Sequence, residues 1–309
     1  MRNKRHLFFT LICVIVLTNC SAQKIEAPKF NADRSFAYLE KQVDFGPRVP
    51  GSEESKNCRN YFYEFFDSLN IQIDSQYFSF FDPYSKTELP LVNVIASYKT
   101  EKKNSKKILI VAHYDCRPRG EYAEDPKLKD VPIDGANDGA SGVAVLMELA
   151  NMFHKKDPGV DVDLFLTDGE DWGKPGDLPY YCLGAKEFAR RGIKGKYEFG
   201  ILLDMIGDEY QKIYREVYSE RFAKEYNDMV WRVAKELNIN TFIDTVKATV
   251  YDDHLALNAG GVPTIDIIDF DYPYWHTEFD TPDKCSAQSL DNVGRVVLEI
   301  IYNQSIWPN

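Results

Sequence analysis

The sequence has little glycine and proline, and it has no strong cluster of positive charge. Its 309 residues include 18 glycines and 15 prolines, and 44% are hydrophobic, which excludes a collagen-like, low-complexity or disordered chain. Lysine and arginine number 37 against 48 aspartate and glutamate, so the formal net charge is −11. Basic residues gather only in one short segment, residues 102–107, which is typical of a solvated loop. We therefore expect no nucleic-acid partner, because a phosphate backbone requires a basic surface.

Long apolar runs are absent after the first 22 residues, and those residues have the layout of a secretory signal peptide. A basic start, residues 2–5, precedes a mostly apolar run from Leu7 to Leu17, which is too short to span a bilayer comfortably. The segment Leu-Thr-Asn-Cys at residues 17–20 resembles a bacterial lipobox, in which Cys20 would carry a lipid; cleavage near Ala22 is the alternative. We expect an exported protein, periplasmic or an outer-membrane lipoprotein, whose membrane contact would be limited to an anchor at Cys20.

Cysteine pairs with metal-binding spacing are missing as well. None of the six cysteines forms a C-x-x-C motif, so a zinc site built from thiolates is not expected. Four of them follow the expected signal peptide: Cys58, Cys116, Cys182 and Cys285. An exported chain can form disulfides, but the sequence does not distinguish the three ways of pairing four cysteines. The simpler interpretation is that they are small buried residues, and it leaves open one bridge among them.

Residues 23–309 alternate between apolar β-type runs and helical patterns. Strands are expected at residues 76–82, 90–98, 107–113, 161–167, 199–205 and 263–269, and helices at 33–44, 52–69, 141–154, 182–191, 218–237 and 287–303. The continuous apolar runs 108–111 and 201–203 are typical of strands that are covered on both faces. Strands alternating with helices predict a single α/β domain, an α/β/α sandwich with a mostly parallel central sheet.

Acidic and imidazole side chains lie where several of these strands end. His113 ends one strand and Asp204 lies near the end of another, while the pair Glu170–Asp171 follows a third. Ligands of such sheets bind at the carboxyl ends of the strands, so one cleft could gather these groups. Each signal alone also fits a structural histidine, a turn or a helix cap. Together, carboxylates and imidazoles without thiolates favour a catalytic zinc site, with one carboxylate of the pair on the metal and the other moving protons.

The order of the motifs resembles that of a known enzyme family. The segments FGPRVPGS, HYD, GANDGASG, DGED, LLDMIG, DDH and WHT follow one another between about residues 45 and 277. In this order they resemble the zinc-dependent aminopeptidases of the bacterial leucyl-aminopeptidase type. They resemble still more closely the cyclising relatives of that family, the glutaminyl-peptide cyclotransferases or glutaminyl cyclases. The resemblance implies a zinc aminopeptidase-like fold for residues 23–309.

The resemblance also implies a set of metal ligands. One zinc would be held by Asp138, Asp171 and His276, and Glu170 would be the carboxylate that moves protons. In the two-metal peptidases of the family, a second zinc would be held by His113 and Asp204, with Asp138 as the bridge. The cyclases retain equivalents of these residues but bind a single zinc. One zinc is therefore expected, or two if the protein is an aminopeptidase. Asp171 departs from the Glu that many relatives carry at this position, but it remains an oxygen ligand.

Two features favour the cyclase over the aminopeptidase. Trp275 directly precedes the predicted histidine ligand, as in the cyclases, where an aromatic residue walls the glutamine pocket. Asp252 lies in a double-Asp motif like that of the cyclases, and there it would share an acidic network with Asp204. We expect Trp275, Trp172 and Phe270 to line the substrate pocket; simple packing in an aromatic-rich chain is the alternative.

The reaction implied is conversion of an N-terminal glutamine to pyroglutamate with release of ammonia, catalysed by Glu170, Asp204 and Asp252. The expected partners are exported peptides or proteins that begin with glutamine. The nearest alternative is a two-zinc aminopeptidase that removes N-terminal residues. A further alternative is a binding-only relative, but such relatives lose ligand residues and this sequence retains the full set.

Overall fold

The structure, a computed structural model, describes residues 25–308, so the expected signal peptide and Cys20 lie outside the described part. A six-stranded sheet has the order β1-β2-β4-β3-β5-β8. Its strands are β1 (Gln72–Asp82), β2 (Thr87–Tyr98), β3 (Lys107–His113), β4 (Asp161–Thr167), β5 (Gly200–Asp204) and β8 (Thr264–Ile268). β3 pairs in parallel with β4 and β5, and β5 with β8, whereas β2 pairs antiparallel with β1 and β4. The predicted mostly parallel sheet is confirmed, with an antiparallel edge.

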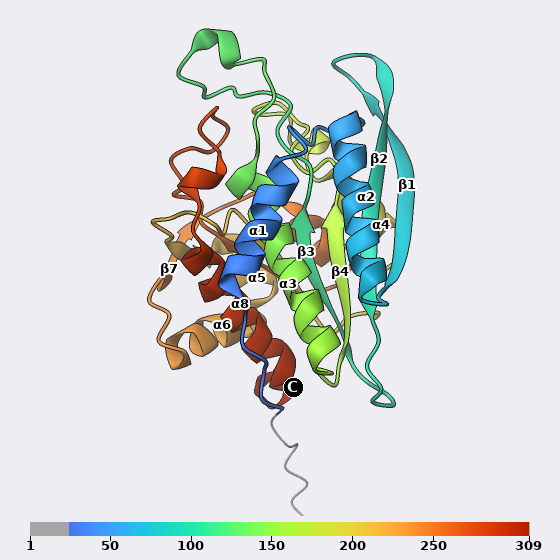
Figure 1. The fold of residues 1–309 in the computed structure, drawn as a ribbon, viewed down its shortest axis with the longest axis vertical. Helices are drawn as coiled ribbons and strands as arrows, with labels where there is room; N and C mark the ends of the chain where they lie inside the picture. The colour runs from blue at the N-terminus through green and yellow to red at the C-terminus, as the bar shows by residue number, and fades with distance from the viewer. Residues whose placement is uncertain (1–24, 309) are drawn as a thin grey trace, which may run out of the picture.

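Helices cover both faces of this sheet. They are α1 (Ala32–Val43), α2 (Glu53–Ser68), α3 (Ser141–Lys155), α4 (Leu183–Arg190), α5 (Val217–Phe222), α6 (Lys224–Glu236), α7 (Asp253–Ala259) and α8 (Ala287–Tyr302). Ile108 and Ile110 of β3 join a large core with α1, α2, α3, α6 and α8, whereas Leu109 and Val111 join a smaller core with α4 and α7. Figure 1 looks onto the first face, with α1, α2 and α3 in front of β3 and β4. The α/β/α sandwich is therefore confirmed.

The predicted helix 218–237 is wrong as a single element. α5 ends at Phe222, and α6 begins at Lys224. Ala223 separates them, because its φ of −140° lies outside the helical region. Phe222, the last residue of α5, is 47% exposed, so it does not continue the buried face of α6. Neither glycine nor proline marks the break, so the apolar spacing alone did not reveal it.

Two short strands, one short helix and several 3₁₀ turns were not predicted. β6 (Ile213–Glu216) and β7 (Phe242–Ala248) form a separate two-stranded parallel sheet. α7 begins directly after Asp252, whose side chain caps the helix by accepting from the backbone N–H of Asp253. Short 3₁₀ turns lie at Pro126–Leu128, Leu178–Tyr180, Pro282–Lys284 and Gln304–Ile306.

The described residues, 25–308, bear on two predictions: the lack of a membrane-spanning segment and the state of the cysteines. Within this range no helix has both the length and the apolar character needed to cross a bilayer. Cys58, Cys116, Cys182 and Cys285 are all buried and unpaired. The cysteines after the expected signal peptide are therefore small buried residues, as the sequence indicated, without the bridge that it left open.

A candidate metal centre at the carboxyl ends of the strands

The predicted ligands come together at one end of the sheet. His113 is the last residue of β3, and Asp204 is the last residue of β5. Asp171 follows β4, Asp138 lies in an irregular turn before α3, and His276 lies in the loop between β8 and α8. All five side chains are buried. Parallel strands bring these sequence-distant residues to a common edge.

A glycine allows the turn that carries Asp138 to approach β3. Gly139 has a φ of +102°, a conformation that side-chain-bearing residues rarely adopt. A Cβ atom at this position would lie 2.6 Å from the carbonyl oxygen of Asp115 and 3.0 Å from the ring of His113. The glycine after Asp138 therefore serves close packing of the turn against the end of β3.

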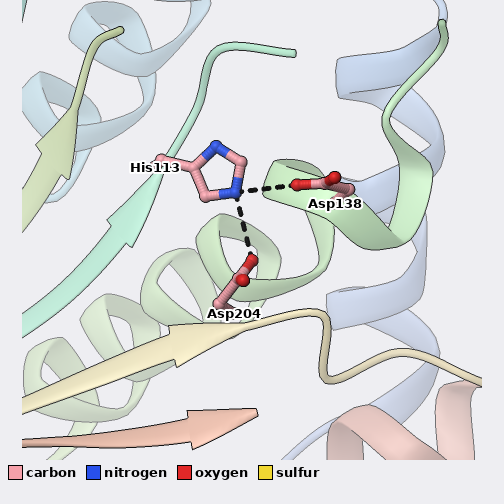
Figure 2. A group of neighbouring side chains, drawn as sticks. All are labelled: His113, Asp138 and Asp204. Atoms are coloured by element: carbon pink, nitrogen blue, oxygen red, sulfur yellow. Dashed lines mark hydrogen bonds and ion pairs between the residues drawn. The ribbon is translucent and has the colours of Figure 1, made fainter. Parts of the chain in front are cut away.

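The first group of ligand-type side chains is His113, Asp138 and Asp204. The Nε2 atom of His113 lies 3.1 Å from Oδ1 of Asp138 and 3.1 Å from Oδ1 of Asp204, as Figure 2 shows. One atom from each of the three residues lies within 4.8 Å of the others. The geometry therefore brings the residues implied for a second zinc into one cluster.

The second group shares Asp138 and adds Asp171 and His276. The Nε2 atom of His276 lies 3.6 Å from Oδ2 of Asp138 and 3.4 Å from Oδ1 of Asp171. Asp138 thus offers one carboxylate oxygen to each group. The Oδ2 atoms of Asp138 and Asp171 are buried and lack a hydrogen-bond partner. Buried carboxylate oxygens beside an imidazole nitrogen fit the donor set of a zinc ion.

Two further carboxylates hold the backbone of the ligand segments. Asp280 accepts hydrogen bonds from the backbone N–H groups of Asn137 (2.8 Å) and Asp138 (3.2 Å) and from the Tyr272 hydroxyl (2.8 Å). Asp115 accepts from the backbone N–H groups of Glu170 and Asp171, at 3.2 Å each. Sequence reasoning missed both roles. Asp115 lies within the HYD motif, so a signal existed for it; Asp280 had none.

Burial and neighbouring charge separate the pKa values of Glu170 and Asp171. Burial raises the pKa of Glu170, and the carboxylates of Asp252 and Asp171 raise it further. Burial also favours a raised pKa at Asp171, but the positive charge of Arg117 and the contact with His276 outweigh it and hold that pKa well below its usual range. Glu170 therefore binds a proton more readily than Asp171, which fits a proton carrier beside a metal ligand.

Glu170 lies with Asp252 and Cys182. Ligand-type atoms of the three residues lie within 4.8 Å of one another. The Cys182 thiol donates to Oε1 of Glu170 at an Sγ–Oε1 distance of 3.3 Å, and the Cys182 backbone N–H donates to the Glu170 carbonyl at 2.8 Å. Cys182 has a φ of +55°, in the left-handed region. The sequence gave no sign that this cysteine contacts Glu170.

The carboxylates open into a small cavity of about 60 Å³. Its walls include Glu170, Asp204 and Asp252 together with Phe270 and Trp275. The last two also line an outer, more apolar cavity of about 230 Å³, so the two spaces are contiguous. Two of the three aromatic residues expected at the pocket are therefore found there.

Trp172 lies elsewhere than the sequence suggested. Its indole N–H donates to Oδ1 of Asp82 at 3.0 Å, and its ring packs against the cluster of Leu89, Leu91 and Leu183. It is not among the residues that line either cavity. Its side chain connects the loop after β4 to the end of β1.

Comparisons with known proteins agree with this geometry. Peptidase family M28 matches residues 93–301. A glutaminyl cyclase of Bacteroides thetaiotaomicron bound to N-acetylhistamine is 40% identical, with a TM-score of 0.85 over 90% of this chain and 99% of that one. A leucine aminopeptidase precursor from the same organism is also 40% identical, with a TM-score of 0.86 and the same coverage. The glutaminyl cyclase of Porphyromonas gingivalis is 33% identical, with a TM-score of 0.83 over 88% of this chain and 98% of that one.

A more distant relative is Aminopeptidase YwaD of Bacillus subtilis, which is 24% identical over 204 residues. The match covers 63% of this chain but only 40% of that protein's length. Relatives with both activities in their names are thus similar to this chain. The M28 match spans most of the sequence, and solved relatives at least 30% identical are covered almost completely. The chain belongs to the zinc-dependent peptidase family M28.

Proposed function

We propose that this protein is a zinc-dependent glutaminyl-peptide cyclotransferase, which converts an N-terminal glutamine to pyroglutamate and releases ammonia. The observation that carries the proposal is the grouping of Glu170, Asp204 and Asp252 in one small cavity beside Trp275. Similarity to several glutaminyl cyclases supports it. We further propose that the N-terminal segment, residues 1–22, exports the protein, either by lipoprotein processing that anchors it through Cys20 or by cleavage near Ala22. We also propose that residues 23–309 form the catalytic domain.

In the proposed site, Asp138, Asp171 and His276 would hold the metal, and a zinc ion bound there would supply Lewis-acid chemistry at the γ-carbonyl oxygen of the substrate glutamine. Asp204 and Asp252 hold the α-amino group against the γ-amide carbon. Glu170 takes a proton from the attacking amine and gives one to the leaving amide nitrogen. A C–N bond to the α-nitrogen forms, the bond to the amide nitrogen breaks, and ammonia leaves.

The small cavity suits this reaction because the nucleophile belongs to the substrate. The glutamine side chain and its own α-amine must share the space, and no activated water is required. Phe270 and Trp275 wall the cavity and continue into the outer apolar space, where the rest of the peptide would lie. The substrates we propose are exported peptides or proteins with an N-terminal glutamine.

A two-zinc aminopeptidase is the second candidate, and one observation favours it. His113, Asp138 and Asp204 form a compact group that could hold a second metal (Figure 2). In that case Asp204 would bind metal rather than the substrate amine. The proposed roles of Asp204 in the two enzymes are therefore mutually exclusive, and product analysis separates them.

The test is mass spectrometry of a glutamine-led peptide incubated with zinc-loaded protein. Loss of one ammonia from an otherwise intact peptide, faster than without enzyme, is the expected result. Release of free glutamine would make the protein an aminopeptidase. A peptide with an N-acetylated glutamine is the matched control, because its blocked amine cannot cyclise. A leucine-led peptide tests hydrolysis separately, and no cleavage of it is expected.

A further inference from the structure

An ion pair between a buried arginine and a partly buried glutamate lies beside the predicted metal ligands and has no role in the function proposed so far. Arg117 and Glu121 lie in the loop that follows β3, and the Arg117 side chain has no exposed surface. A guanidinium group has five N–H donors. The Nε and Nη2 atoms of Arg117 donate to the carboxylate of Glu121, Nη2 also donates to the Tyr181 hydroxyl, and Nη1 donates twice to Asp171. All five donors therefore have acceptors.

Arg117 holds Asp171 at two points. Its Nη1 atom lies 2.6 Å from Oδ1 and 2.9 Å from the backbone carbonyl oxygen of Asp171. The carboxylate and the backbone are thus tied to the same nitrogen, which restricts rotation of the side chain. The other carboxylate oxygen, Oδ2, is buried and has no hydrogen-bond partner. Arg117 therefore occupies Oδ1, which also lies 3.4 Å from Nε2 of His276, and it leaves Oδ2 without a protein partner and free for a cation.

The same loop contacts His276. The Oε1 atom of Glu121 lies 3.8 Å from Nδ1 of His276, which is longer than a hydrogen bond, and this buried nitrogen has no hydrogen-bond partner in the structure. The other ring nitrogen, Nε2, faces Asp138 and Asp171. The next residue, Tyr122, donates its backbone N–H to the His276 carbonyl at 3.2 Å. Its ring stacks on the imidazole at a centroid distance of 5.9 Å and an angle of 10°. One short segment thus holds two ligands that come from different parts of the chain.

We propose that Arg117 and Glu121 are positioning residues of the metal centre: Arg117 orients Asp171 and Glu121 orients His276, so that both are placed for zinc before it binds. The inference rests on the zinc centre proposed above and not on which reaction that centre serves. Mutation of a residue that hydrogen-bonds a metal ligand and orients it typically lowers metal affinity by about 10- to 100-fold.

If Arg117 acted only through its charge, its removal would change the zinc affinity in the opposite direction. A fixed positive charge near a zinc ion repels it, so removing Arg117 would strengthen zinc binding if charge were its only effect. Positioning predicts that zinc binds more weakly when the guanidinium fork is lost. Arg117→Lys keeps the charge and removes the paired donors, because an ammonium group cannot reproduce the planar fork. It therefore isolates geometry from charge.

The experiment measures zinc affinity of the purified protein by competition with a chromophoric chelator. Arg117→Lys and Glu121→Gln are the test variants. Arg119→Lys is the matched control: Arg119 belongs to the same loop and donates to the backbone carbonyls of Trp172 and Gly173, but to no predicted ligand. We expect about 10- to 100-fold weaker zinc binding for Arg117→Lys, a smaller loss for Glu121→Gln and no change for Arg119→Lys.

A second readout follows the ligand geometry. Cobalt(II) is substituted for zinc, and the visible absorption of the test variants should shift while that of Arg119→Lys stays like the wild type. Thermal unfolding with chelator present checks that each apo variant folds. If Arg117→Lys does not fold, the zinc affinity and cobalt spectrum of Glu121→Gln test the proposal. Unchanged or tighter zinc binding with an unchanged cobalt spectrum overturns the proposal, as does a wild type that binds no zinc. If the variants bind zinc more weakly but the wild type releases free glutamine, the positioning role of Arg117 and Glu121 is supported and the cyclase function is refuted.

Discussion

Replacing Cys182 by alanine should slow the reaction without weakening metal binding. Within residues 25–308, the Cys182 thiol is the only hydrogen-bond donor to the carboxyl group of Glu170. Both residues are buried, so water does not readily replace the lost donor. Alanine keeps the Cβ atom and the backbone contact between the two residues, and it removes only the sulfur.

The expected magnitude follows from the lost contact. A hydrogen bond to a charged group contributes about 1.5–3 kcal/mol, and a thiol is a weak donor, so the lower end applies. A barrier increase of about 1.4 kcal/mol corresponds to a roughly tenfold lower rate. We therefore expect kcat of Cys182→Ala to fall about tenfold, with KM and zinc content unchanged. Cys182→Ser restores a donor and should recover most of the rate.

The assay follows ammonia release from a glutamine-led peptide at saturating zinc, with kcat and KM determined separately. The zinc content of each variant is measured in parallel. A kcat within twofold of the wild type for Cys182→Ala would refute the reasoning. Equal losses in the alanine and serine variants would refute it as well, because they would indicate packing rather than hydrogen bonding. If the protein hydrolyses peptides instead, the same comparison applies to that reaction.

Three other outcomes are expected. Glu170→Gln should lower kcat by about 10²–10⁴-fold while zinc remains bound, which metal analysis and kinetics on one sample would check; retained activity would contradict its role as proton carrier. Asp280→Ala removes the acceptor of two backbone N–H groups and one hydroxyl. In urea titrations it should reduce the free energy of unfolding by about 3 kcal/mol or more, and a loss below about 1 kcal/mol would contradict a role for Asp280 in holding the turn. Burial favours a raised pKa at Glu216, but His254 and the backbone N–H groups of the next helix lower it. Its carboxylate therefore stabilises the fold above an unfolded pKa of about 4.3, and this contribution is lost as the pH falls through the lower folded pKa. Glu216→Gln should thus flatten the acid limb of stability against pH, and an unchanged slope would argue against the shift.

Much of the fold could be predicted because its signals are local. Continuous apolar runs marked β3 and β5, which are covered on both faces, and the helical spacing of α3 and α8 reflects their packing on the sheet. β6 and α7 were missed because they are short. β6 has four residues, and α7 begins with the polar run Asp253-His254, which is buried by contacts rather than marked by apolar spacing.

The predicted ligands were visible in the sequence because acidic and imidazole residues stood at strand ends and in a familiar order of motifs. The sequence by itself determined which residues are candidate ligands, from His113 to His276, and which of them lie at the ends of strands. Only the tertiary structure decided that Asp138 offers one oxygen to each ligand group, that Trp172 turns toward β1, and that Cys182 contacts Glu170. It also decided that Arg117 lies against Asp171. The physical reason is that periodicity reports which face of an element is buried, whereas these contacts join side chains that are brought together only when the loops pack at the end of the sheet.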